Sequence, residues 1–114
     1  MRHEIKKISR IVDELTTLFL KEDTNEVDFS IKRQPDRTVI KIVDYRTHFE
    51  DDFIEQLREL FNTQRQCEVE EYYWQLCGEV DEDEELTLIG CMIDEATVEK
   101  REGNLYLELV RYHQ

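Results

Sequence analysis

The stretch from Asp83 to Val110, DEELTLIGCMIDEATVEKREGNLYLELV, constrains the fold more than any other part of the chain. Its second half predicts two strands, residues 97–101 and 104–111, joined by a tight turn around Glu102-Gly103-Asn104. A helix followed directly by a hairpin packs on the same sheet, because neither element can bury its apolar side alone. The apolar spacing that predicts the helix is carried by Leu86, Ile89, Met92, Ile93 and Ala96.

The first half of the chain predicts one helix and a second hairpin. Apolar residues recur at three- and four-residue steps over residues 3–21, which is typical of an amphipathic helix. Residues 27–31 then alternate between apolar and polar side chains, as in a half-buried strand. A returning strand is expected over residues 38–44, because Gln34-Pro35-Asp36 is turn chemistry and the connection is short.

Two further helices are expected between the hairpins. The apolar spacing over residues 49–61 predicts the first of them, with Thr47 as its start residue. A shorter helix should follow and end at Gly78. The predicted order is therefore α-β-β-α-α-α-β-β. An α/β two-layer sandwich, with helices on one face of a mixed four-stranded sheet, would bury every apolar stripe.

Composition narrows the classes of function. With 114 residues the chain is most simply one domain. It has 28 acidic and 15 basic residues, so its formal net charge is −13. A nucleic-acid backbone would be repelled over most of such a surface. A protein partner with a basic patch is electrostatically favoured instead.

The sequence also bears on the compartment. No apolar run approaches the roughly 18 residues of a membrane span, and the charged amphipathic start is unlike a signal peptide. The three cysteines, Cys67, Cys77 and Cys91, are an odd number without paired spacing. We therefore expect reduced thiols in a cytoplasmic protein, with a Cys67–Cys77 disulfide as the alternative.

Three segments carry the residues of a known pattern. Glu14 begins the segment ELTTL in the first helix, Asp44 begins DYRTH after the second strand, and Asp94-Glu95 stands at the last helix-to-strand junction. Together with the element order, they resemble the histidine-kinase-like (GHKL) ATPase family, as in anti-sigma-factor serine kinases. The resemblance implies one domain of that fold over residues 1–114.

The chemistry that the resemblance implies is altered at each of these segments. Where that family has an asparagine that holds magnesium, this chain has Leu18, and leucine offers no oxygen to a hard cation. Arg46 and His48 replace two glycines that permit close ligand approach. Residues 83–86 replace a glycine loop that receives phosphate, and carboxylates there would occupy the place of an anion. We expect that ATP and magnesium are lost, and that no cofactor or catalytic residue is present.

The expected function is therefore regulatory binding of a protein, through an aromatic and acidic segment. Three consecutive aromatics cannot all face one side of a helix, so an outward one is a candidate anchor, although core packing of two is equally compatible. Residues 79–85 hold six carboxylates in seven positions, which suits either a solvated loop or an epitope for a basic partner. The predicted partner-binding residues are Tyr72, Tyr73, Trp74, Asp81, Glu82, Asp83 and Glu84.

Two alternatives stay open. The chain is alternatively a divergent ATP-binding protein or small serine kinase, in which Glu14 and Asp44 contact the nucleotide and its magnesium. It is alternatively a self-associating structural domain, such as a homodimer, whose final strand is a free edge. The spacing of His and Cys residues indicates no metal site.

Overall fold

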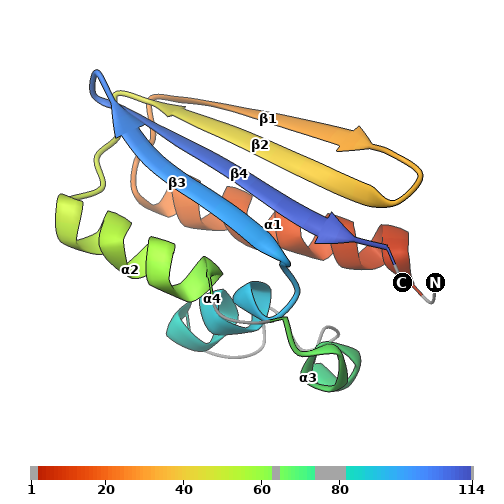
Figure 1. Cartoon of the computed structure of the whole chain (residues 1–114). Coiled ribbons are helices and arrows are strands. Elements are labelled where there is room, and N and C mark those ends of the chain that lie inside the picture. The colour runs from red at the N-terminus through yellow and green to blue at the C-terminus, as the bar shows by residue number, and fades with distance from the viewer. Residues whose placement is uncertain (1–2, 63–64, 74–81, 114) are drawn as a thin grey trace.

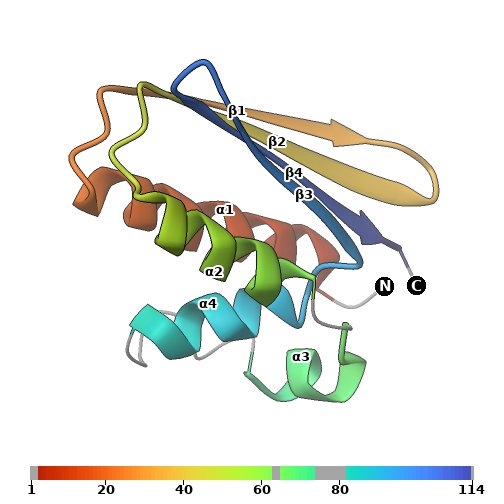
Figure 2. The ribbon, with the colours of Figure 1, turned by 60° about the vertical axis from the view of Figure 1, so that its left-hand side comes forward.

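The chain folds into a four-stranded sheet with its helices packed on one face, as Figures 1 and 2 show. The computed structural model describes residues 3–62, 65–73 and 82–113, and of residues 71–73 and 82–85 the backbone alone. The helices are α1 (Glu4–Lys21), α2 (Asp51–Phe61), α3 (Cys67–Tyr73) and α4 (Glu82–Gly90). The strands are β1 (Glu26–Arg33), β2 (Arg37–Tyr45), β3 (Glu95–Arg101) and β4 (Asn104–Tyr112).

The expected mixed sheet is wrong, because every neighbouring pair of strands is antiparallel. The strand order is β1-β2-β4-β3, so β4 lies between β2 and β3. The expectation that the final strand is a free edge is therefore wrong too. Leu105, Leu107 and Leu109 of β4 are all buried, whereas β3 buries Val98 alone. The more apolar strand of this hairpin thus takes the central position, and β1 and β3 form the edges.

The predicted end of the fourth helix is also wrong. Helix α4 ends at Gly90, and Ala96 lies in β3. Asp94 fixes the chain before the strand, since its N–H donates to the Val110 carbonyl (2.8 Å) and its carboxylate accepts the Tyr112 N–H (2.6 Å). Met92 and Ile93 are buried in the connection, so their spacing mimics a helix that has already ended.

The main core lies between the sheet and the inner sides of the helices. Phe19 of α1 makes edge-on contacts with Phe29 of β1 (ring centroids 6.3 Å apart) and with Phe49 before α2 (5.5 Å). Helix α1 follows its predicted boundaries closely and buries Ile11 and Leu15 completely. Burial of one such side chain contributes about 1.5–3 kcal/mol, so the inner side of α1 supplies much of the packing energy.

Tight turns set the register of both hairpins. Glu102 and Gly103 both have positive φ angles, 52° and 82°, as a two-residue type I′ turn requires. The other hairpin closes at Pro35-Asp36, where the Gln34 N–H donates to the Arg37 carbonyl (2.8 Å). Among the described helices, none is both long enough and apolar enough to cross a membrane.

A buried group of charged side chains joins α1, α3 and the end of β4, and we call it the ion cluster. Arg111 lies at its centre and is 1% exposed. Its guanidinium donates to both oxygens of Glu4 (2.8 and 2.9 Å) and of Glu70 (2.7 and 2.8 Å), and to the Met92 carbonyl (2.8 Å). The members of the cluster are Glu4, Lys7, Arg65, Glu70, Asp94 and Arg111.

The remaining members complete the charge balance of the ion cluster. Lys7 lies 2.8 Å from Glu70, and Arg65 bridges Glu70 (3.1 Å) to Asp94 (2.8 Å). Arg65 also donates to the Tyr112 carbonyl (2.7 Å). Among the side chains that the structure describes, three cations thus face three carboxylates. A buried charge that loses its partner is strongly destabilising, so the cluster stabilises one arrangement of these elements.

The ion cluster shifts the pKa of its carboxyl groups. Burial by itself would raise the pKa of Glu70, but hydrogen bonds from Arg111, Lys7 and Arg65 outweigh it and hold that pKa at about 2. In the same way, burial opposes and Arg111 lowers the pKa of Glu4. Both carboxyl groups are therefore charged in the folded protein at neutral pH.

The protein should lose stability in acid because of Glu70. A depressed folded pKa adds stability that is complete above the ordinary glutamate pKa of 4.5 and is lost as the pH falls toward about 2. The shift corresponds to about 3 kcal/mol of unfolding free energy. We expect Glu70→Gln to lower the unfolding free energy by about 3–5 kcal/mol at neutral pH. The variant should also lose less stability than the wild-type protein as the pH falls. Denaturant unfolding at a series of pH values measures both effects.

The matched control is Glu68→Gln, which removes an exposed carboxylate from the same helix. It should leave both the stability and its pH dependence unchanged. An equal decrease of unfolding free energy in acid for the wild-type protein and Glu70→Gln would contradict the role assigned to the ion cluster.

Candidate functional site

The resemblance to the ATPase family directs attention to Asp44, near the end of β2. Asp44 is 1% exposed, and its Oδ1 accepts a hydrogen bond from the Thr24 hydroxyl (2.9 Å). Its Oδ2 is buried and has no hydrogen-bond partner among the described residues. Leaving a buried acceptor unpaired costs about 1–3 kcal/mol. Asp44 is thus a buried strand residue, and one of its oxygens is not hydrogen-bonded by any described residue.

The turn after Asp44 is attached to the other hairpin. Arg46 has a φ angle of 52°, in the left-handed region that favours glycine. Its N–H donates to the Asn104 side-chain oxygen (2.9 Å), and the Thr47 N–H donates to the Gly103 carbonyl (3.0 Å). The backbone therefore adopts a glycine-like turn although the residue is arginine.

His48 and Thr47 have local roles beside this turn. The exposed His48 ring lies 3.1 Å from the Asn25 side-chain nitrogen. Thr47 was the expected start residue of α2, but its hydroxyl accepts the Phe49 N–H (3.2 Å), and the helix begins at Asp51. Thr47 thus closes the turn before the helix instead of capping the helix itself.

Glu14 and Leu18, the two α1 residues compared above with the ATPase family, are both buried. Leu18 is 7% exposed and belongs to the hydrophobic core, so it offers packing and no ligand atom at this position. Glu14 is 8% exposed and also lies on the inner side of α1. The C-terminal half of α1, the end of β2 and the start of α4 lie toward the same end of the molecule (Figures 1 and 2).

Helix α4 begins at Glu82, within the acidic run. Its first turn therefore contains Glu82, Asp83 and Glu84, where the helix dipole favours negative charge. This agrees with the expectation that carboxylates, not glycines, open the helix. Asp81 lies outside the described residues, and the backbone alone is described for Glu82, Asp83 and Glu84.

The predicted aromatic contact residues lie on or after α3. Tyr72 and Tyr73 belong to the last turn of that helix, and Trp74 lies outside the described residues, as does the expected helix end at Gly78. Helix α3 is held through Glu70, which reaches α1 and β4 by way of the ion cluster. The backbone that carries Tyr72 and Tyr73 is thereby anchored from one side.

The face of the sheet that no helix covers is a surface that was not predicted from the sequence. A concavity of about 340 Å³ lies on this face, and its lining includes Lys41, Thr97, Arg101, Tyr106 and Glu108. The Arg101 guanidinium stacks on the Tyr106 ring, 4.4 Å from its centroid. The alternating pattern of β4 contained the signal, since every polar position between its buried leucines points to this face.

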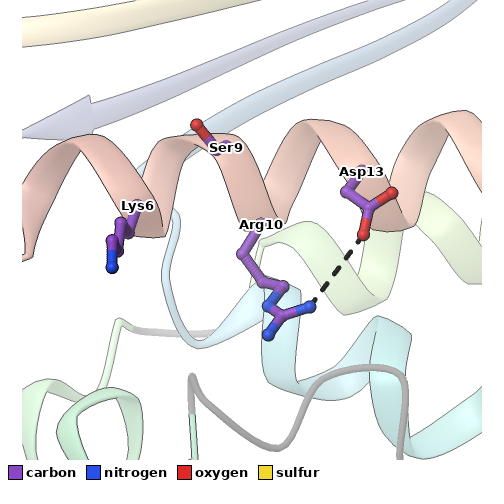
Figure 3. Close-up of a pocket in the computed structure, with 4 residues that line it drawn as sticks. All are labelled: Lys6, Ser9, Arg10 and Asp13. Atoms are coloured by element: carbon purple, nitrogen blue, oxygen red, sulfur yellow. Dashed lines mark ion pairs between the residues drawn. The ribbon is translucent and has the colours of Figure 1, made fainter.

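A second hollow, of about 350 Å³, lies along the outer side of α1 and is drawn in Figure 3. Lys6, Ser9, Arg10 and Asp13 line it. Arg10 and Asp13 form a loose ion pair at 4.0 Å, and both are substantially exposed. This hollow is a solvated helix surface, because Arg10 and Asp13 are paired with each other and the exposed Lys6 lies apart from them.

The described residues hold no group of three metal-ligating side chains close enough to bind an ion. Cys91 is buried, and burial together with the Glu70 carboxylate raises the pKa of its thiol, which makes it a poor nucleophile. Cys67 is exposed on α3, and Cys77 lies outside the described residues. The expected reduced state of all three cysteines therefore stays a prediction.

Comparison with known proteins found no match for this sequence. The sequence matches no model of a known protein family, and no curated protein is similar enough to count as a relative. The resemblance to the histidine-kinase-like ATPases thus stays a hypothesis based on the segments around Glu14, Asp44 and Asp94.

Arg46 offers a direct test of the glycine-like turn. Replacement by Gly removes the strain of a left-handed residue, of order 1–2 kcal/mol, but adds about 0.4–1 kcal/mol of unfolded-chain entropy. We therefore expect Arg46→Gly to be neutral or stabilising by up to about 1.6 kcal/mol. Arg46→Val should destabilise, because a β-branched residue tolerates this φ poorly. Denaturant unfolding of both variants provides the measurement, and a Val variant as stable as the Gly variant would contradict the assignment.

Proposed function

We propose that this protein is a non-catalytic regulatory domain, on a histidine-kinase-like ATPase fold with a degenerate nucleotide site, that binds a protein carrying a basic patch. The acidic first turn of α4 carries this proposal. Helix N-termini commonly bind anions, and here Glu82, Asp83 and Glu84 supply the negative charge from the chain itself. An incoming phosphate would meet like charge, whereas an Arg- or Lys-rich surface would meet attraction.

Two further observations support the loss of nucleotide chemistry. Leu18, at the position of the family's magnesium ligand, is buried in the core, where it gives no oxygen to a cation. Arg46 and His48 bring side chains to positions where a bound nucleotide in that family meets glycine, and both are exposed. The net charge of −13 adds long-range attraction toward a basic partner.

The aromatic segment would complete the contact surface. Tyr72 and Tyr73 precede the acidic run, and their helix is fixed to the body of the protein through Glu70. Tyrosine and tryptophan are the residue types that most often anchor interfaces, while acidic neighbours set orientation and the association rate. In this proposal Tyr72, Tyr73 and Trp74 supply affinity, and Asp81, Glu82, Asp83 and Glu84 supply selection for positive charge.

Neutralising the acidic run should weaken partner capture without unfolding the domain. The variant replaces the six carboxylates of residues 79–85 by their amides, Glu→Gln and Asp→Asn. Removing several complementary charges should lower capture by at least about tenfold, since close interfacial charge pairs are worth about 1.5 kcal/mol or more. Quantitative affinity capture identifies the partner, and calorimetry with the purified partner then measures binding directly.

A control of equal net charge separates local recognition from overall charge. It neutralises the same number of exposed carboxylates elsewhere and should retain capture. Equal loss in both variants, or no loss in either, would remove the acidic run from the proposed contact. The carboxylates changed in the control are Glu22, Glu50, Asp52, Glu59, Glu68 and Glu102.

A second candidate, nucleotide binding, is favoured by one observation. The buried Oδ2 of Asp44 is an unused acceptor among the described residues, and a ligand amino group would satisfy it. In this alternative Asp44 and Glu14 contact ATP with its magnesium, and the protein is a divergent ATP-binding protein or a small serine kinase. The phosphate end of such a ligand would have to avoid the acidic start of α4.

Calorimetry with ATP, ADP and magnesium discriminates between the two functions. On the primary proposal we expect no saturable heat with either nucleotide. Micromolar binding that disappears in Asp44→Ala, but persists in Asp28→Ala as a matched surface control, would establish the second candidate instead. Far-ultraviolet circular dichroism of each variant shows whether a lost signal reflects lost folding.

A further inference from the structure

The outer edge of β1 presents unused backbone groups. At the hairpin end the Gln34 N–H donates to the Arg37 carbonyl. In an antiparallel pair every second residue hydrogen-bonds to the neighbouring strand. Lys32 and Ser30 therefore direct their backbone N–H and C=O groups toward β2. The intervening residues direct theirs outward, and no side chain of the described residues hydrogen-bonds to them. These outward-facing residues are Val27, Phe29, Ile31 and Arg33.

The opposite edge of the sheet is protected. The Arg58 side chain, from α2, donates from Nε (3.1 Å) and Nη2 (2.7 Å) to the Val98 carbonyl of β3. A guanidinium on an edge carbonyl blocks the addition of another strand there. The two edges therefore differ, and β1 is the one available for pairing.

Apolar side chains extend the β1 edge into the helical layer. Ile5, Val12 and Phe19 are seven residues apart, so they form one stripe along α1, and Phe19 packs against Phe29 of β1. Ile5 is 65% exposed, and Ile31, on the helix-facing side of β1, is 49% exposed. An exposed apolar side chain on an open edge strand marks an interaction surface, and Ile31 is such a side chain.

We propose that this edge binds β1 of a second copy of the chain, antiparallel, with a two-fold axis at Ser30. This proposal does not rest on the proposed function. An axis at Ser30 pairs residues whose numbers add up to 60. Because this sum is even, paired residues lie on the same face of the strand. The helical layers of the two copies then lie on the same side of the joined sheet. Asp28 then lies opposite Lys32 of the second copy, and Phe29 opposite Ile31 of the second copy.

The sequence Asp28-Phe29-Ser30-Ile31-Lys32 is self-complementary in this register. The two-fold axis makes the Asp28–Lys32 contact twice and the Phe29–Ile31 contact twice. The polar Ser30 lies at the centre of the exposed face. Opposite charges and apolar pairs directly across strands are both stabilising. Asp28 accepts the Tyr45 hydroxyl through Oδ2 (2.8 Å), so its Oδ1 is the oxygen that faces the lysine.

A charge exchange tests the pairing and its register. Asp28→Lys places two lysines opposite each other at both contacts, and Lys32→Asp places two aspartates there. Each single variant should weaken dimerisation by at least about tenfold. The double variant, and an equimolar mixture of the two single variants, should both recover it, since each restores every opposite-charge pair. Sedimentation equilibrium over a concentration series measures the masses.

The matched control reverses a charge on the protected edge. Glu99→Lys changes an exposed residue of β3 and should leave the dimer unchanged. Wild-type protein that stays monomeric up to its solubility limit would overturn the proposal. Dimers that do not respond to the single variants, or that are not recovered by the double variant and the mixture, would overturn it as well. Circular dichroism of each variant confirms that the fold is intact.

Discussion

The ion cluster around Arg111 is the interaction on which the rest of the structure depends. It joins the start of α1, the connection before α3, α3 itself, the connection before β3 and the end of β4, which are far apart in the sequence. The cluster is buried, so each charge needs its partner, and misplacing one element would leave several ions unpaired in a medium of low polarity. A purely apolar contact there would tolerate sliding, whereas the guanidinium fixes positions and angles.

The same arrangement separates two kinds of surface. The helices cover one face of the sheet, as Figure 1 shows. The other face carries Tyr106, Arg101 and their neighbours. At the end of the molecule near Asp44, the glycine-like turn at Arg46 is attached to the β3–β4 turn. The backbone of this turn is thus glycine-like, whereas its exposed side chains Arg46 and His48 are not, which is compatible with the proposed loss of a nucleotide site.

Much of the fold was predictable from periodicity, and the errors have a common cause. The boundaries of α1 and of the strands followed from local apolar patterns, because one exposed and one buried side are enough to define such an element. The last helix was extended wrongly through Ile93 and Ala96, since burial in a connection gives the same spacing as burial on a helix. Asp94 holds the connection after the helix through contacts with Val110 and Tyr112, and these residues are distant in the sequence.

The sequence by itself determined where most of the helices and strands lie and the acidic start of α4, because these depend on neighbouring residues. Only the tertiary structure decided that β4 is central, that all strands are antiparallel and that Arg111 is buried among carboxylates. Strand order depends on which apolar strand fills the middle of the sheet. The partners of a buried charge are likewise set by which elements meet in space, and no local pattern records either.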